Sequence, residues 1–339
     1  MKGLRNLVVL LIIVLGGAYG LVRDMQAQLH SRLQLRNPAV FEVIKGQTLD
    51  AVVGELAAHQ WLPSARTKQY LKLYLRLKPE LAAVKAGEYE LAPTMTPLDV
   101  LGLFASGRVM LHELRILEGW KFSQALEAVQ QNDALQHTLP ATATAADVMA
   151  AIGHADQEAE GRFFPDTYLF PRGTTDVAYL KRAYAAGEKT LDELWRTRAS
   201  GLPYRSSYDA LIMASIVERE TAVPEERSMV AGVFIRRLTK SMRLQTDPTV
   251  IYGLGDAFDG NLRKRDLLAD TPYNTYTRAG LPPTPICLPG RAALAAAMQP
   301  AAGEALYFVA RGDGTHQFSS TLTEHDAAVR RYQLGHNKP

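Results

Sequence analysis

Glu218 stands at the end of an almost wholly apolar run, where a charged residue needs a reason. The run extends from Ala210 to Val217 and predicts a helix. A carboxyl held against leucine, isoleucine and methionine side chains loses hydration, which raises its pKa toward the range useful for a general acid. The same residue is equally explained as the polar end of a buried helix, where it would pair with Arg219 or another cation.

Glu220 lies only two residues away, yet the helical period turns it from Glu218. At about 100° per residue the two carboxylates point almost opposite ways, so they cannot act together on one substrate. Ser206 with Asp209 forms a candidate capping box for the start of this helix. Chemistry at this helix is therefore expected to rest on one carboxylate.

Several other reaction classes lack their residue patterns in the 339-residue chain. The eight histidines form no His-Glu-x-x-His, and there is no Gly-x-Ser-x-Gly elbow, P-loop or Gly-x-Gly-x-x-Gly. A cysteine nucleophile could only be Cys287. No metal and no cofactor is expected. The net charge of +3 is too small to indicate nucleic-acid binding.

Three polar and aromatic segments could hold a polar polymer. They are residues 164–168, 244–249 and 271–276. Aromatic faces stack on sugars, while asparagine, glutamine and threonine side chains hydrogen-bond sugar hydroxyl and acetamido groups. Asp166 and Asp247 each neighbour a proline, so capping a turn is the simpler explanation for either.

The N-terminus predicts a membrane anchor over residues 1–22. From Leu7 to Val22 sixteen residues carry no charge, which makes about 24 Å of helix against a bilayer core of about 30 Å. Lys2 and Arg5 precede this run, so the positive-inside rule places the N-terminus in the cytoplasm. We expect a single-pass protein of the bacterial inner membrane with its bulk in the periplasm. A cleaved signal peptide is the alternative.

A linker over residues 23–37 is expected to lead into a small module over residues 38–108. Its pattern predicts a strand over residues 40–44, helices over residues 49–59 and 67–77, and a second strand over residues 87–91. Another helix is expected from Thr96 to near Gly107. Residues 43–49 and 86–91 resemble parts of a LysM domain, a family that binds N-acetylglucosamine polymers. A degenerate copy that only spaces the chain is the alternative.

Residues 109–339 predict a larger mixed α+β domain, so the expected fold class of the whole chain is α+β. Helices are expected over residues 122–131, 141–152, 177–198, 206–218, 224–238, 291–298 and 323–332, the last opened by a Thr323–Asp326 capping box. Strands are expected over residues 111–117, 305–310 and 315–319.

The motifs of this larger region resemble the MltG-type (YceG-like) endolytic murein transglycosylases. The resemblance rests, in family order, on residues 161–168, 214–221, 244–252, 273–276 with 280–286, and 307–318. It implies that Glu218 is the family's catalytic glutamate. It also implies that the sugar cleft is lined by Asp166, Gln245, Asp247, Tyr273, Asn274, Tyr276 and His316.

The resemblance further implies cleavage inside peptidoglycan glycan strands between N-acetylmuramic acid and N-acetylglucosamine. The product is a 1,6-anhydro end, and the partners are penicillin-binding proteins that polymerise glycan. The competing hypothesis is a membrane-tethered scaffold that binds peptidoglycan for such synthases without cutting it. In that case Glu218 would be a structural ion-pair partner.

Overall fold

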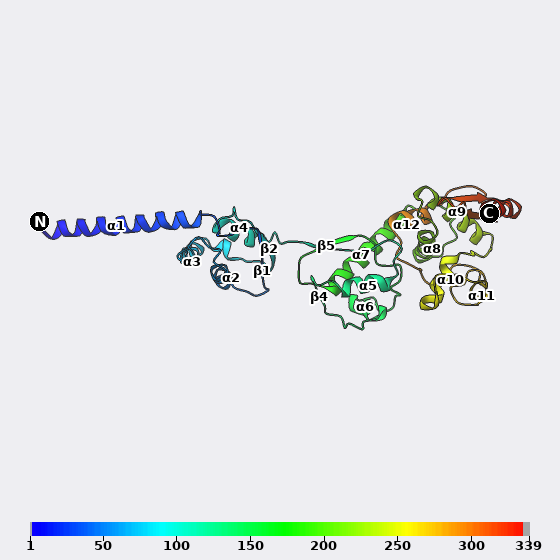
Figure 1. Cartoon of the computed structure of the whole chain (residues 1–339), viewed down its shortest axis with the longest axis horizontal. Helices are drawn as coiled ribbons and strands as arrows, with labels where there is room; N and C mark the ends of the chain where they lie inside the picture. The colour runs from blue at the N-terminus through cyan, green and yellow to red at the C-terminus, as the bar shows by residue number, and fades with distance from the viewer. Residues whose placement is uncertain (1, 335–339) are drawn as a thin grey trace. The chain divides into compact units, whose positions relative to one another are not determined.

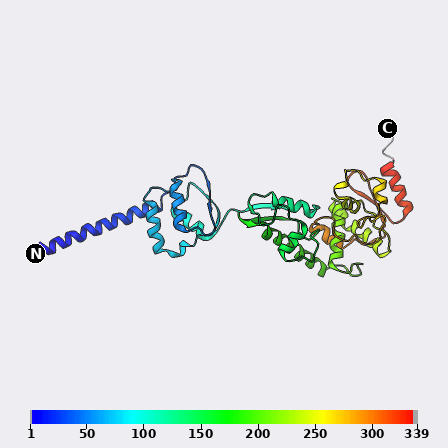
Figure 2. The same ribbon diagram turned by 90° about the horizontal axis from the view of Figure 1, so that it is seen from below.

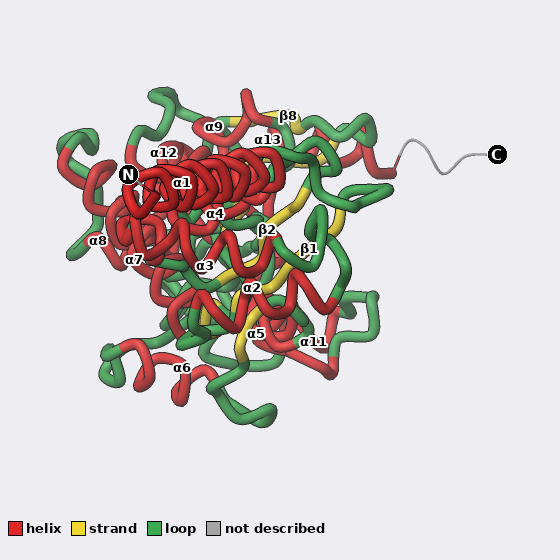
Figure 3. The backbone as a smooth tube through the Cα atoms, turned by 90° about the vertical axis from the view of Figure 1, so that its left-hand side faces the viewer, coloured by secondary structure: helices red, strands yellow, loops and turns green. Residues whose placement is uncertain are grey.

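The computed structural model describes residues 2–334 and has the expected mixed α+β class. Helices predominate, and each sheet is a pair of short strands (Figure 1 and Figure 3). The chain divides into two compact units. The first comprises Met1–His112 with Phe170–Gly173, and the second comprises Glu113–Leu169 with Thr174–Pro339.

The first element, α1 (Lys2–Leu29), is one uninterrupted helix of 28 residues (Figure 2). At 1.5 Å per residue it is about 42 Å long, enough to cross a bilayer core. Its composition also permits this, and none of its apolar window is buried. The helix continues past the predicted end of the anchor at Val22. Leu29 and Leu33 are buried in the core of the first unit, so part of the predicted linker is packed structure.

The first unit has the predicted order of strand, two helices and strand. Its elements are β1 (Ala39–Val43), α2 (Leu49–Ala58), α3 (Thr67–Leu77), the 3-10 turn η1 (Pro79–Ala82), β2 (Gly87–Leu91) and α4 (Pro97–Ser106). β1 pairs antiparallel with β2, with Ala39 opposite Leu91. Beneath the pair, the Phe104 ring contacts those of Phe41 and Tyr89 at centroid distances of 5.6 and 4.8 Å.

The second unit begins with helices that alternate with short strands. They are β3 (His112–Arg115), α5 (Phe122–Gln130), β4 (Leu135–Gln136), α6 (Ala145–Ile152), β5 (Thr167–Phe170), β6 (Thr174–Thr175) and α7 (Asp176–Arg196). β3 pairs with β5, and β4 pairs parallel with β6.

The rest of the second unit carries most of the predicted site residues. Its elements are α8 (Ser207–Glu220), η2 (Pro224–Glu226), α9 (Arg227–Thr239), α10 (Asp247–Leu254), η3 (Gly255–Ala257), α11 (Lys264–Leu268), α12 (Arg291–Met298), β7 (Tyr307–Ala310), β8 (His316–Ser319), α13 (Leu322–Val329) and the π-helical turn η4 (Arg330–Leu334). β7 and β8 form an antiparallel hairpin with Tyr307 opposite Ser319.

The helix α8 is the centre of the second unit's core. Every residue from Ala210 to Val217 is buried, and the helix packs against α9 and α12. A helix that is apolar all round must be covered on all sides, so its polar last turn is where side chains can face a cavity. The predicted helix is confirmed. The predicted capping box is wrong, because Asp209 instead accepts a hydrogen bond from the Arg205 N–H at 2.8 Å and Ser206 makes no cap bond.

The closing helix α13 is also confirmed, but its predicted capping box is displaced. Thr321 and Glu324 form the box, two residues earlier than the predicted Thr323 and Asp326. Both pairs fit the spacing of such a box, and the sequence pattern alone does not choose between them. The earlier start places His325 in the first turn of the helix.

Candidate active site

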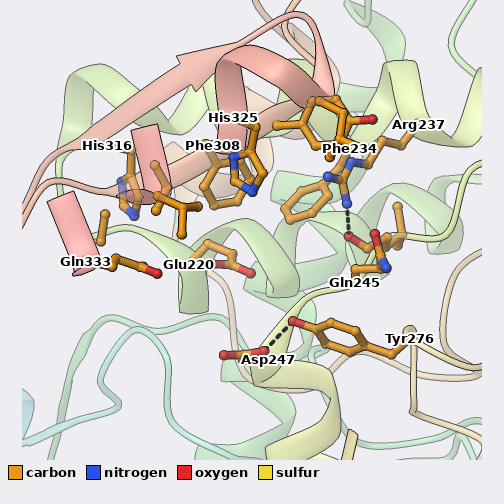
Figure 4. Close-up of a pocket in the computed structure, with 16 residues that line it drawn as sticks. Glu220, Phe234, Arg237, Gln245, Asp247, Tyr276, Phe308, His316, His325 and Gln333 are labelled. Carbon is orange, nitrogen blue, oxygen red and sulfur yellow. Dashed lines mark hydrogen bonds between the residues drawn. The ribbon is translucent and has the colours of Figure 1, made fainter. Parts of the chain in front are cut away.

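A cavity of about 500 Å³ lies in the second unit, at the polar end of α8 (Figure 4). Four of the sequence-predicted site residues line it together: Gln245, Asp247, Tyr276 and His316. Its other walls come from α9 and the segment after it, the β7–β8 hairpin, α13 and η4. Those walls contribute Phe234, Arg237, Leu244, Tyr307, Phe308, Val309, Ala310, Leu322, His325, Val329 and Gln333. The carboxylate in this cavity on α8 is Glu220.

Glu220 is the last residue of α8 and is held in the cavity by one hydrogen bond. The Thr246 hydroxyl donates to Oε1 of Glu220, and within residues 2–334 the second oxygen, Oε2, has no hydrogen-bond donor. The pKa of Glu220 is raised to about 7, mainly by burial, with a smaller rise from the nearby charge of Asp247 and a lowering by the hydrogen bond from Thr246. His316 and Arg237 oppose this shift. Glu220 can therefore hold a proton near neutral pH and release it.

Asp247 and Tyr276 form the wall beside Glu220. The Tyr276 hydroxyl donates to Oδ1 of Asp247 at 2.5 Å (Figure 4). The segment before Asp247 is fixed because the Gln245 N–H donates to the Thr275 carbonyl at 3.1 Å. Gln245 has φ of +52°, a left-handed conformation that costs free energy for a residue with a side chain. Tertiary contacts therefore hold this stretch in place.

His316 is oriented by Glu226. One oxygen of Glu226 accepts from the His316 backbone N–H at 2.8 Å, and the other lies 2.7 Å from Nδ1 of the ring. Both side chains are largely buried, at 13% and 11% exposure. The carboxylate sets which ring nitrogen carries a proton, because Nδ1–H must donate to it. Nε2 is left as the ring nitrogen available to the cavity.

Arg237 contributes a buried cation to the same cavity. Its Nε donates to the Leu306 carbonyl at 2.6 Å and its Nη1 to the Leu244 carbonyl at 2.7 Å. The guanidinium also lies 5.2 Å from the centroid of the Tyr307 ring. These contacts fix the charge in place, where it favours the ionised form of Glu220.

Glu218 does not line this cavity. Its Oε2 accepts from the Gly290 N–H at 2.9 Å, which is the N-cap position of α12. Its Oε1 lies 3.9 Å from Nη2 of Arg227. The helical period puts Glu218 and Glu220 on different sides of α8, as expected. Burial raises the pKa of Glu218 as well, and Glu118 nearby raises it further. A carboxylate at a helix N-terminus stabilises that helix.

Three other predicted cleft residues do not line the cavity. Asn274 is fully buried, and its amide donates to the carbonyls of residues 266, 267 and 269. The Tyr273 hydroxyl pairs with Thr284 Oγ1 at 2.8 Å. Asp166 is exposed and accepts from the Thr167 N–H at 2.7 Å. All three stabilise local loop geometry in this structure.

The sequence interpretation missed Glu220, Arg237 and His325 as cavity residues. The helical period separates the side chains of Glu220 and Glu218, but it does not show which side of α8 faces the polar segments. No local pattern marks His325 as a cavity residue. The His325 ring stacks on that of Tyr307, with centroids 5.2 Å apart, and burial lowers the pKa of His325.

Neither a cysteine nucleophile nor a metal site is favoured by the described residues. Cys287 is fully buried, and burial raises the pKa of its thiol well above the ordinary value, which disfavours the reactive thiolate. Within residues 2–334 no group of three histidine, cysteine, aspartate or glutamate side chains is placed to hold a metal ion.

Comparison with known proteins places most of the chain in one family. Residues 41–331 match the YceG-like family. The endolytic murein transglycosylase of Bacillus subtilis (strain 168) is 28% identical over 349 residues, covering 96% of this chain and 93% of that protein. The protein of the same name from Streptococcus pneumoniae (strain D39) is 28% identical over 74% of this chain. The matched part covers about half (51%) of the length of that protein.

A solved structure agrees with the sequence match. The crystal structure of a YceG-like protein from Listeria monocytogenes is 28% identical, with a TM-score of 0.52, and covers 86% of this chain and 99% of that one. A family match that extends from the first strand to beyond α13 includes every residue of the cavity except Gln333. The chain therefore belongs to the YceG-like family.

Proposed function

We propose that the protein is an endolytic murein transglycosylase in which Glu220 is the catalytic acid and base. The observation that supports Glu220 is its position in the same cavity as Gln245, Asp247, Tyr276 and His316, four residues expected to bind sugar. Glu218, the catalytic glutamate predicted from the sequence, is absent from that cavity and caps α12. Family membership and the names of the relatives support murein as the substrate.

In the proposed reaction one carboxyl gives one proton and then takes up another. Protonated Glu220 donates to the glycosidic oxygen while the bond from the muramic acid anomeric carbon to that oxygen breaks. The resulting carboxylate then takes the proton of the muramic acid 6-hydroxyl, whose oxygen bonds to the anomeric carbon. The products are a free N-acetylglucosamine 4-hydroxyl and a 1,6-anhydro end. No water is consumed, so the second carboxylate that ordinary glycosidases need is not required.

The neighbours of Glu220 suit both halves of this cycle. The negative charge of Asp247 favours the protonated carboxyl before cleavage and stabilises the positive charge that develops on the sugar. Arg237 and His316 favour the carboxylate after it has given up its proton. A pKa near 7 keeps both protonation states accessible at neutral pH.

The proposal predicts that cleavage slows in alkaline solution. Because the pKa of Glu220 is raised to about 7, the protonated acid is fully present below that pH and is lost as the pH rises through it. We expect kcat/KM to fall about tenfold per pH unit above the pKa of the acid. The measurement is the rate of glycan shortening between pH 5 and pH 9. A rate that stays constant from pH 7 to pH 9 would contradict the assignment.

Glu226 is expected to act through His316. In Glu226→Gln the side chain that faces Nδ1 of His316 loses its negative charge. The His316 ring is then held less firmly and binds sugar less well. We expect KM to rise about tenfold with a much smaller change in kcat. Steady-state kinetics on purified glycan strands measures both constants. Glu225→Gln, at an exposed neighbouring position, is the matched control. A fall in kcat at constant KM would show a different role.

The membrane assignment is part of the same proposal. Its support is the long exposed apolar helix α1, with Lys2 and Arg5 at its start. We propose a single pass through the bacterial inner membrane, with the N-terminus cytoplasmic and the second unit periplasmic. Work beside penicillin-binding proteins follows from the implied action on nascent strands, and co-purification in detergent tests it.

The role of the first unit is a further part of the proposal. We propose that it is a LysM-like module that holds glycan, and the support for this is its order of strand, two helices and strand. Incubation of the full chain in detergent with isolated glycan strands separates this enzyme from a non-cutting scaffold. Shortened strands support the enzyme, and binding without shortening supports the scaffold.

A further inference from the structure

A second cavity lies in the second unit and shares no lining residue with the first. Its volume is about 530 Å³, within the range of small-molecule sites. Its walls are the start of α5, the start of α6, the turn at residues 158–160 and the end of α10. The proposed reaction uses none of the residues that line it.

The most buried polar group of this cavity is the carboxyl of Glu160. Its Oε1 accepts from the Phe122 N–H at 2.9 Å, and its Oε2 accepts from the Tyr252 hydroxyl at 3.0 Å. The charge of the nearby Lys121 ammonium favours the ionised form of this carboxyl. Burial raises the pKa of Glu160 to about 7. A cationic ligand beside this carboxyl would favour its ionised form and would be bound by the resulting negative charge.

The helix α10 connects the two cavities. Asp247 at its first position lines the active-site cavity, and Tyr252, five residues on, lines the second. Five residues of helix rise about 7.5 Å. The rings of Tyr252 and Tyr273 also contact each other, with centroids 4.9 Å apart. The helix α10 therefore places one lining residue of each cavity within about one and a half helical turns.

The charges of the second cavity differ from those expected for a sugar subsite. Lys121 supplies a cation, 5.4 Å from the Tyr252 ring centroid, while Glu127, Glu158 and Glu160 supply carboxyls. Glycan sugars are mostly uncharged. The peptide that branches from each muramoyl sugar carries carboxylates and, at its diamino acid, an ammonium group. A lining of both signs fits such a zwitterionic chain better than it fits a pyranose ring.

We infer that this cavity binds the stem peptide of a muramoyl residue while the sugar strand occupies the active-site cavity. The ammonium of the peptide lies toward Glu160 and a peptide carboxylate lies toward Lys121. The inference rests on the proposed function for the identity of the strand. It makes the protein prefer strands that still carry peptides.

The test measures binding without cleavage. It uses the full chain in detergent, with the Glu220→Gln substitution in every protein tested so that the strands are not cut. Two probes are used: peptide-bearing glycan strands, and the same strands after an amidase has removed the peptides. We expect the peptide-bearing strands to bind about tenfold more tightly, since hydrogen bonds to charged groups contribute strongly. In Glu160→Gln, which keeps the shape and one acceptor of the side chain, the ratio should fall to about one. Lys121→Met, at a partly exposed position, should also reduce it.

Glu188→Gln is the matched control, because Glu188 pairs with Arg162 at 2.9 Å and lies outside the cavity. It should keep the full ratio. Equal affinity of the background protein for both probes overturns the inference and leaves the proposed function standing. A ratio that survives in both Glu160→Gln and Lys121→Met also overturns it. Failure to bind either probe contradicts the proposed function itself, and the inference with it.

Discussion

Glu220→Gln is expected to lower the rate of glycan cleavage about a thousandfold or more. The variant has no group that can give a proton to the glycosidic oxygen and take up the proton of the 6-hydroxyl. Glutamine has nearly the same shape and can still accept the hydrogen bond from Thr246, so the fold should be retained. The rate of strand shortening by the full chain measures the effect. Thermal melting of the same preparation checks the fold.

Glu218→Gln is the matched control on the same helix. Glutamine retains an acceptor for the Gly290 N–H, and only the weak ion pair with Arg227 at 3.9 Å is lost. We therefore expect a small loss of stability and most of the activity to remain. Loss of all cleavage in Glu218→Gln with full activity in Glu220→Gln would reverse the assignment and restore the role predicted from the sequence.

Gly187→Ala is expected to destabilise the second unit by about 3 kcal/mol, at the upper end of the cost of overpacking. A Cβ at this position of α7 would lie 2.0 Å from the backbone carbonyl oxygen of Arg162. The backbone cannot yield easily there, since the Phe164 N–H also donates to the Ala183 carbonyl at 3.0 Å. Denaturation in urea, followed by circular dichroism, measures the loss.

Gly102→Ala is the corresponding control. Gly102 lies inside α4, and a Cβ there would have no neighbour within 4 Å. This replacement should be neutral or raise helix stability by about 0.5 kcal/mol, because alanine restricts the unfolded chain. Equal stability of Gly187→Ala and the unmodified protein would show that α7 and the segment at residue 162 are less tightly packed than described.

Local patterns predicted the elements of the fold well. The predicted bounds of α3, β2 and α12 agree with the structure, because each has a clear period and is bounded by proline, glycine or polar residues. The central helix α8 was predictable from its continuous apolar run. The helix α10 was not expected, because Asp247-Pro248 resembles a turn as much as it resembles the first turn of a helix.

The residue pattern by itself does not choose between two carboxylates, whereas the family resemblance implies Glu218. Both Glu218 and Glu220 lie in one motif, and burial raises the pKa of each. Tertiary packing gives them different neighbours. The helix α10 and the β7–β8 hairpin lie on the Glu220 side of α8, and the N-terminus of α12 lies on the Glu218 side. Those contacts join residues far apart in the chain, such as Glu218 with Gly290, and no local pattern encodes them.

In the proposed reaction one carboxyl, Glu220, completes the cleavage without water. Digestion of glycan strands with the wild-type chain in water enriched in oxygen-18, followed by mass measurement of the new ends, tests this. We expect 1,6-anhydro ends that carry no heavy oxygen. Reducing ends labelled with oxygen-18 would contradict it, because they require an attacking water and a second carboxylate to activate it, for which Asp247 in the same cavity is the candidate.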